Sequence, residues 1–322
     1  MHTLLDPAIL FFVFGVLAGM LRSNLQIPAP ISRFLSLYLL MALGLKGGFA
    51  LAHSGLTLEV AGTLGIAVLL AMVVPLLGYP LLRRLLNGYD ATALAATYGS
   101  VSAVTFITTI QFLENQQIAY GGHMAAAMAL MESPAIIMAV LLANRLRQQA
   151  GQTEDGHTPT PLGKILHESF TDGAQLLLLG AMLIGLLTGE AGKAAMAPFS
   201  VDLFKGMLAF FLLDMGLMTA RNLGGLKGKS PWLLAYAILA PLAHAALALG
   251  LASLAGASAG NAALLMALAA SASYIAVPAV LREAIPEANP SLYFGMSLGL
   301  TFPFNILLGI PLYVGVAQAV LG

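Results

Sequence analysis

The sequence predicts an all-α membrane protein whose ten transmembrane helices form two inverted repeats of five. Three observations predict this fold class. Of the 322 residues, 59% are apolar and only 9% are charged, whereas soluble domains carry about 25% charged residues. The mean hydropathy is +0.89. Long apolar segments also follow one another along the whole chain.

The composition excludes several classes of protein. The 14 basic residues balance the 14 acidic residues, so the chain lacks the basic surface that nucleic-acid binding requires. The absence of cysteine excludes disulfides, thiolate metal sites and cysteine nucleophiles. The 34 glycines favour a membrane bundle in which helix backbones approach one another closely.

A helix needs about 20 apolar residues to cross the hydrocarbon of a membrane. The first apolar segment has no basic region before it and no small-residue cleavage site after it, so it is predicted to be a spanning helix and not a signal peptide. The ten predicted segments are 6–22, 31–52, 57–86, 91–114, 119–149, 162–190, 198–222, 231–255, 258–284 and 289–321.

One hydrophilic linker, from Asn144 to Lys164, lies near the middle of the chain. It separates a first five-helix repeat at 1–149 from a second at 162–322, with residues 150–161 as the linker itself. Because each repeat has an odd number of crossings, the two repeats enter the membrane from opposite sides.

The basic residues predict the orientation. If the linker is cytoplasmic, most lysines and arginines near helix ends lie on its side, and the exceptions are Lys46, Lys193 and Lys205. Cytoplasmic loops carry the excess of basic residues. The sequence therefore predicts a cytoplasmic linker and two external termini.

A shift of 173 residues (273 − 100) relates the fourth and ninth segments. It places Ser100–Tyr120 over Ser273–Tyr293, and the identical pairs are Ser100/Ser273, Ala103/Ala276, Val104/Val277, Glu114/Glu287 and Tyr120/Tyr293. Inverted repeats of this kind are typical of transporters that work by alternating access.

Both aligned windows contain small and polar residues in mid-membrane, at 97–105 and 270–278. Gly99 lowers the cost of a non-helical backbone, and Pro278 has no amide to donate. We expect each helix to break there, leaving free amides and a partial positive charge that together bind an anion. The alternative is that the hydroxyls bond to carbonyls of their own helix. The candidate substrate-binding residues are Ser100, Ser102, Ala103, Thr105, Ser271, Ser273, Tyr274 and Ala276.

Four stretches, Leu25–Pro28, Gly44–Gly48, Leu281–Ser291 and Leu308–Ala319, carry a family resemblance. Over nearly the whole chain the sequence resembles the sodium-dependent bicarbonate transporter family of bacteria. The resemblance implies bicarbonate and sodium symport across the inner membrane by an elevator mechanism. It also implies a scaffold domain of helices 1, 2, 6 and 7, and a core (transport) domain of helices 3–5 and 8–10, in which the broken helices 4 and 9 cross.

The resemblance implies a homotrimer as well, and Gly44, Gly47 and Gly48 would permit close approach of helix 2 to another helix. The family also has a cytoplasmic regulatory partner of the nitrogen-signalling type. The short linker of this chain gives no ground to assume that partner here.

The chain departs from the family pattern at the helix breaks. Ala103 and Val104 replace a glycine and a serine, and Tyr274 replaces an aspartate. A tyrosine is a neutral donor at pH 7 and can hydrogen-bond an anion, but it cannot neutralise sodium as a carboxylate does. Sodium dependence is therefore expected to be weak or absent, which leaves sodium and proton coupling as alternatives.

An acid in the membrane usually faces a partner or a cavity. Glu132 replaces an acid of the family, and its equivalent under the shift is Asn305 (132 + 173). Glu132 and Asn305, with Ser102 and Tyr274, are candidates for cation or proton coupling, and a bound sodium would contact Glu132, Ser102 and Ser273. For Glu132 the alternative is a structural hydrogen bond that braces the broken helices. No other cofactor is predicted.

Asp214 is a second acid within an apolar segment, and it is expected to pair with Lys46 or Lys205.

The sequence predicts no enzyme, because it contains neither a His-Glu-x-x-His zinc motif nor a phosphate-binding Gly-x-x-x-x-Gly-Lys loop. Two alternatives to a cation-coupled bicarbonate transporter remain. One is a transporter of the same fold for a different small anion, either proton-coupled or uncoupled. The other is a degenerate transporter that acts as a sensor.

Overall fold

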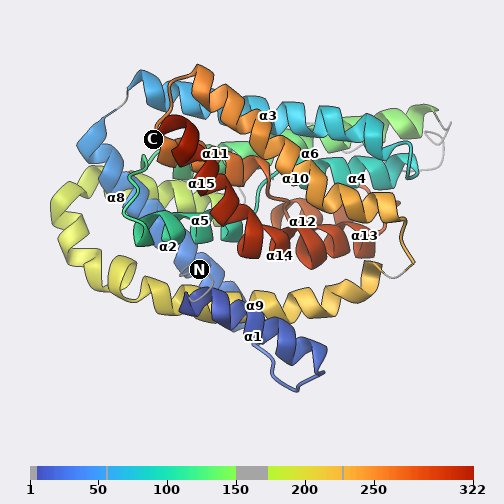
Figure 1. Ribbon diagram of the computed structural model, residues 1–322, viewed down its shortest axis with the longest axis horizontal. Coiled ribbons are helices and arrows are strands. Elements are labelled where there is room, and N and C mark those ends of the chain that lie inside the picture. The colour runs from blue at the N-terminus through green and yellow to red at the C-terminus, as the bar shows by residue number, and fades with distance from the viewer. Residues whose placement is uncertain (1–5, 56, 150–172, 227) are drawn as a thin grey trace.

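The computed structural model describes residues 6–55, 57–149, 173–226 and 228–322, and within these ranges every regular element is a helix (Figure 1). Seven helical stretches are long and apolar enough to cross a membrane, and α1 (Pro7–Met20) and α11 (Ala259–Ala269) are shorter apolar helices. The predicted all-α membrane class is confirmed. The number of ten crossings stays a prediction, and the linker 150–161 lies outside the described residues.

Two helix pairs form one part of the molecule, which we call the four-helix group. In it α1 packs along α9 (Phe204–Asn222), and α2 (Ala29–Ser54) packs along α8 (Gly173–Ala197) (Figure 1). A π-helical turn, η3 (Pro198–Asp202), joins α8 to α9.

Glycines allow the α2–α8 pair to pack backbone against backbone. A Cβ on Gly48 would lie 2.1 Å from the carbonyl oxygen of Met182, and one on Gly44 would lie 2.4 Å from that of Leu178. Both positions therefore exclude any side chain. These two glycines are occupied by a contact within the chain, so they do not argue for contact between protomers.

The remaining helices form a second part, which we call the broken-helix group. Its first half contains α3 (Leu58–Leu82), α4 (Gly88–Gly99), α5 (Ala103–Asn115) and α6 (Met124–Gln149). A short 3-10 turn, η4 (Leu223–Leu226), leads from α9 to the second half. That half contains α10 (Pro231–Leu254), α11, α12 (Ala276–Ala284), α13 (Pro290–Phe294), η5 (Gly295–Thr301), α14 (Phe302–Phe304), η6 (Asn305–Gly309) and α15 (Ile310–Leu321).

Matching contacts join the outer ends of the two halves. At the start of α11, the side-chain oxygen of Asn261 accepts a bond from the amide of Gly121 at 2.7 Å. At the start of α4, the carboxylate of Asp90 accepts one from the amide of Asn289, also at 2.7 Å. Each half thus holds the loop that follows the other half's broken helix, which is the reciprocity that an inverted repeat would produce.

The predicted pairing of Asp214 with Lys46 or Lys205 is wrong. Asp214 accepts a hydrogen bond from the hydroxyl of Ser32, on α2. Lys46 instead forms an ion pair with Glu114 at 3.1 Å, and the ammonium of Lys205 donates to the side-chain oxygen of Asn115 at 3.0 Å. Both lysines therefore bind the end of α5.

Candidate functional site

The first predicted helix break is confirmed. Helix α4 ends at Gly99, and Ser100 after it has an extended backbone with φ −98° and ψ −174°. Ser102 then caps α5, because its hydroxyl oxygen accepts a bond from the amide of Thr105 at 3.2 Å. A serine at this position is the typical start of a helix, so the polar residues both end one helix and begin the next.

The second predicted break is also confirmed. Helix α11 ends at Ala269 and α12 begins at Ala276. The hydroxyl of Ser273 accepts a bond from the amide of Val277 at 3.2 Å, and Pro278 needs no amide partner. In the first turn of α12, the amide of Val277 is therefore hydrogen-bonded by Ser273, and position 278 has no amide that needs a partner.

The two breaks contact each other directly. The amide of Ser102 donates to the hydroxyl oxygen of Ser271 at 2.9 Å, and the amide of Ser273 donates to the carbonyl of Thr97 at 2.8 Å. Each break thus supplies a hydrogen-bond partner for a buried backbone amide of the other. Buried backbone groups need such partners.

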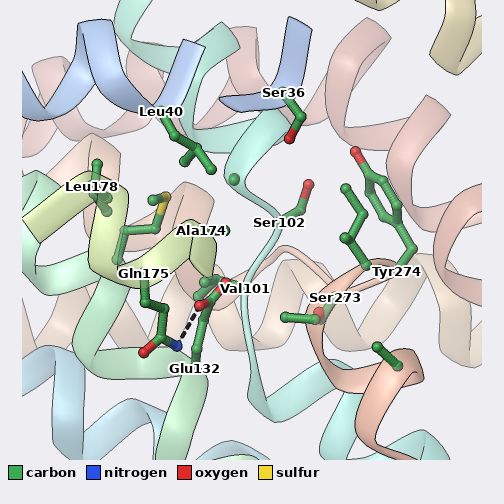
Figure 2. A pocket seen from close by; sticks show the side chains of 15 residues that line it. Ser36, Leu40, Val101, Ser102, Glu132, Ala174, Gln175, Leu178, Ser273 and Tyr274 are labelled. Atoms are coloured by element: carbon green, nitrogen blue, oxygen red, sulfur yellow. Dashed lines mark hydrogen bonds between the residues drawn. The ribbon is translucent and has the colours of Figure 1, made fainter. Parts of the chain in front are cut away.

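A cavity of about 120 Å³ lies against this crossing point (Figure 2). The two helix groups enclose it together, since α2 and α8 form one wall and the broken-helix group forms the rest. The residues that line it are Ser36, Leu40, Val101, Ser102, Ala103, Met128, Glu132, Ala174, Gln175, Leu178, Ser273, Tyr274, Ile275, Ala276 and Ala279.

Two helix N-termini converge on the cavity. Ala103 is the first residue of α5 and Ala276 is the first residue of α12, and both line the cavity. Amides in the first turn of a helix have no partner within the helix, and the helix dipole adds a partial positive charge there. Such a pair of N-termini favours an anion.

Glu132, on α6, has the only carboxylate among the described residues that line this cavity. The side-chain amide of Gln175, on α8, donates to it at 2.5 Å (Figure 2). This bond joins the broken-helix group to the four-helix group. The predicted sodium ligands Glu132, Ser102 and Ser273 thus all face one space, although the described residues contain no group of three acidic, histidine or cysteine side chains that would bind a metal tightly.

Tyr274 lies at the edge of the same cavity and is 5% exposed. Its ring packs edge-on against Phe302, with the centroids 5.3 Å apart. Its hydroxyl points toward the side where Ser36 and Ser102 lie, without reaching hydrogen-bonding geometry with either (Figure 2). The phenol hydroxyl can therefore donate a hydrogen bond to a ligand in the cavity.

Four predicted site residues lie away from the cavity. The hydroxyl of Thr105 donates to Ser102 at 3.1 Å, and that of Ser271 donates to the carbonyl of Leu268 at 2.7 Å. The hydroxyl of Ser100 is buried without a partner among the described residues. These three residues shape the breaks, and their contact with a substrate stays a prediction.

Asn305 is the fourth. Its amide nitrogen donates to the carbonyl of Ala270 at 2.8 Å, and its oxygen accepts from the hydroxyl of Tyr313 at 2.8 Å. Both ends of the side chain are thus used to brace the second break. These two bonds give Asn305 a structural role at the second break, and its part in cation or proton coupling stays a prediction.

The wall that α2 and α8 contribute was not among the predicted site residues, and it includes Ser36 and Gln175. Gln175 is a lone amide in an apolar segment, and a polar residue within the membrane is a reason to suspect a site. Ser36 had no comparable signal, because nothing distinguishes it from serines that bond to their own helix.

A polar cluster joins the two helix groups at the other end of α5. The ammonium of Lys46, on α2, contacts Glu114, and the hydroxyl of Tyr120 donates to the same carboxylate at 2.9 Å. Burial, together with the negative charge of Glu114, raises the pKa of Tyr120. Tyr120 therefore keeps its proton and remains a donor.

Comparison with known proteins gives a family for the chain. No curated protein matches the sequence. A family model described as the Na⁺-dependent bicarbonate transporter superfamily matches residues 7–318, which is nearly the whole chain. This match confirms the resemblance and the prediction that the chain is a transporter and not an enzyme. The chain belongs to the Na⁺-dependent bicarbonate transporter superfamily.

Proposed function

We propose that the protein is a secondary active transporter that imports bicarbonate or a similar small anion, coupled to a cation. The observation that carries the proposal is the convergence of two helix N-termini, at Ala103 and Ala276, on one cavity. Amides at helix N-termini bind anions without a formal positive charge. The anion can therefore leave as readily as it enters, which transport requires.

The cavity favours a small and planar substrate with several oxygen atoms. Its volume is about 120 Å³, and bicarbonate has four non-hydrogen atoms. The amides of Ala103 and Ala276 would bind its oxygens, and the hydroxyls of Ser102 and Ser273 each retain a proton to donate after accepting their capping bonds. The apolar remainder of the wall keeps water from competing.

Glu132 is the group that we assign to coupling. It could bind sodium together with Ser102 and Ser273, or it could bind a proton. Because Tyr274 stands where the family has an aspartate, a sodium ion would have a single carboxylate, whereas hard cations prefer more oxygen ligands with formal charge. We therefore favour the proton. In this proposal the anion and the coupled cation both move into the cell.

We further propose that the four-helix group is the scaffold and that the broken-helix group moves against it as an elevator, in a homotrimer in the bacterial inner membrane. The cavity lies on the boundary between the groups, and the bond from Gln175 to Glu132 crosses that boundary. The ion pair of Lys46 and Glu114 crosses it too. An elevator would have to break both contacts in each cycle.

Transport itself is tested with purified protein in liposomes. Labelled bicarbonate should exchange against internal bicarbonate. An imposed inward proton gradient should drive its accumulation, with or without sodium, beyond the level in protein-free liposomes, which CO2 enters by itself. Accumulation that follows only a sodium gradient would overturn proton coupling. Absence of any exchange would favour the sensor, and exchange of another small anion in its place would favour a different substrate.

The elevator is tested by crosslinking, since the chain contains no native cysteine. In the variant Lys46→Cys/Glu114→Cys, a short bifunctional thiol reagent would tie the two groups together, and transport should stop until the link is reduced. The control variant is His53→Cys/Glu190→Cys. Its contact of 3.2 Å joins α2 to α8 within the four-helix group, so its crosslink should leave transport intact. Full transport by the crosslinked first variant would contradict the elevator.

A further inference from the structure

A groove on the outside of the broken-helix group is separate from the transport cavity. It is lined by the end of α3, by the turn that follows α3 and by α10 from Trp232 to Ala243, and these two helices contact each other. Its volume is about 530 Å³, which is in the usual range for sites that bind small molecules. Apart from Arg84, Trp232 and Tyr236, the residues that line it are leucines and alanines.

We infer that this groove binds one anionic phospholipid, with its phosphate at Arg84 and one acyl chain along α10. The groove follows α10 from Trp232 to Ala243. Eleven helical rises of about 1.5 Å make its length about 16 Å. That length is close to half of the roughly 30 Å hydrocarbon of a bilayer, so the groove is about as long as one leaflet is deep.

The groove is polar at one end and apolar along the rest, as a phospholipid has a polar headgroup and apolar acyl chains. Arg84 and Trp232 lie at one end, at the end of α3 and the start of α10, and both are exposed. Among the described residues the side chain of Arg84 has no ion pair or hydrogen bond, so its charge is available to a ligand. Tryptophan is typical of the headgroup level of a membrane. Leu239, further along, is 61% exposed and would contact only the acyl chain.

The charge of the groove selects an anionic lipid in preference to a neutral one. Arg83 is next to Arg84 and is also exposed, and in the proposed topology both lie on the cytoplasmic side. Anionic headgroups in that leaflet attract basic residues near the surface. An acidic protein segment would satisfy the arginines but not the exposed leucines, and an apolar second copy of the chain would leave the arginines without partners.

The floor of the groove is fixed by packing. Tyr236 is 6% exposed, and its ring packs edge-on against Tyr98 with the centroids 5.2 Å apart. Tyr98 in turn hydrogen-bonds Thr301 at 2.6 Å. The groove is therefore formed before a lipid arrives. Its floor also adjoins the first helix break, since Tyr98 immediately precedes Gly99.

The test is native mass spectrometry of the full-length protein with dioleoyl phosphatidylglycerol or dioleoyl phosphatidylcholine, which requires no transport activity. The wild type should retain one phosphatidylglycerol more tightly than phosphatidylcholine. Arg84→Ala should weaken retention of phosphatidylglycerol about fivefold, which corresponds to one basic residue near the surface. Arg33→Ala, a change of an equally exposed arginine on α2, should not.

A second variant tests the acyl end of the groove. Ala243→Phe should fill it and weaken retention of both lipids, whereas Ala246→Phe, at an exposed position of α10 outside the groove, should not. Equal retention of the two lipids by the wild type would overturn the proposal. So would retention that neither Arg84→Ala nor Ala243→Phe changes, or a loss of oligomers in Ala243→Phe without any loss of lipid.

Discussion

The two helix breaks differ in construction although one sequence shift relates them. The first is short, and a single residue, Ser102, caps the helix that follows it. The second extends from Ala270 to Ile275, and the residue before α12, Ile275, makes no capping bond. Ser273 supplies the cap from further back, and Tyr274 between them reaches the cavity. The first break is thus the shorter one, and the longer second break contributes more of the residues that line the cavity.

The two halves also differ at Glu132 and Asn305, the two positions near the breaks that the sequence shift relates. Glu132 faces the cavity, and Asn305 bonds to Ala270 and Tyr313 away from it. The first half of the broken-helix group therefore supplies a charge at the cavity, and the second half supplies a structural hydrogen bond at the matching position. Two positions that the sequence shift relates can thus both lie next to a helix break while their side chains do different chemistry.

Removing the charge should have the largest effect. Glu132→Gln keeps the size and the hydrogen-bonding capacity of the side chain but can no longer bind a proton or neutralise sodium. We expect it to abolish accumulation of bicarbonate while exchange across the membrane continues. Gradient-driven uptake in liposomes measures accumulation, and counterflow measures exchange. Glu190→Gln, at an exposed acid of α8, is the matched control and should accumulate bicarbonate normally. Normal accumulation by Glu132→Gln would refute its role in coupling.

Removing the brace should affect stability and not coupling. Asn305→Ala leaves the carbonyl of Ala270 and the hydroxyl of Tyr313 buried without their partner. Each lost partner costs about 1–3 kcal/mol, so the thermal unfolding midpoint should fall by several degrees. The protein that remains folded should still accumulate bicarbonate. If Asn305→Ala lost accumulation at unchanged stability, Asn305 would belong with Glu132 in the coupling site.

The hydroxyls at the two breaks should have smaller and similar effects. Ser102→Ala and Ser273→Ala each remove a donor to the anion, and a bond to a charged group contributes about 1.5–3 kcal/mol, so half-saturation by bicarbonate should rise about tenfold. Ser102→Thr and Ser273→Thr keep the hydroxyl and the cap, and they should stay close to the wild type. Unchanged half-saturation in both alanine variants would place the substrate elsewhere.

Much of the fold could be predicted from the sequence, because hydropathy specifies where helices lie and small polar residues specify where they break. Ser102 and Ser273 were expected to lie together because both follow predicted helix breaks, and Glu132 was a candidate because it is an acid in an apolar segment. Contacts between the two helix groups did not follow, since they join side chains without any shared pattern. The bond from Gln175 to Glu132 is of this kind, and so is the true partner of Asp214, Ser32.

The roles of individual polar residues were also beyond the sequence. Asn305 is equivalent to Glu132 by position, yet only its surroundings show that Ala270 and Tyr313 occupy it fully. Likewise Gly44 and Gly48 indicated a close helix contact, and only the structure shows that the partner is α8 of the same chain.

The central claim is that backbone amides at the helix breaks bind the substrate anion, and Ala103→Pro tests it most directly. Proline is favoured as the first residue of a helix, and the backbone of Ser102, with φ −103° and ψ 111°, suits a residue before proline. The change therefore removes one amide with little strain. Ala103→Val adds bulk at the same place and keeps the amide.

The measurement is the half-saturation concentration for counterflow of labelled bicarbonate in liposomes. Loss of one hydrogen bond to a charged ligand, about 1.5–3 kcal/mol, should raise it at least about tenfold in Ala103→Pro, with a much smaller rise in Ala103→Val. A wild-type value in Ala103→Pro, or an equal rise in both variants, would contradict the account.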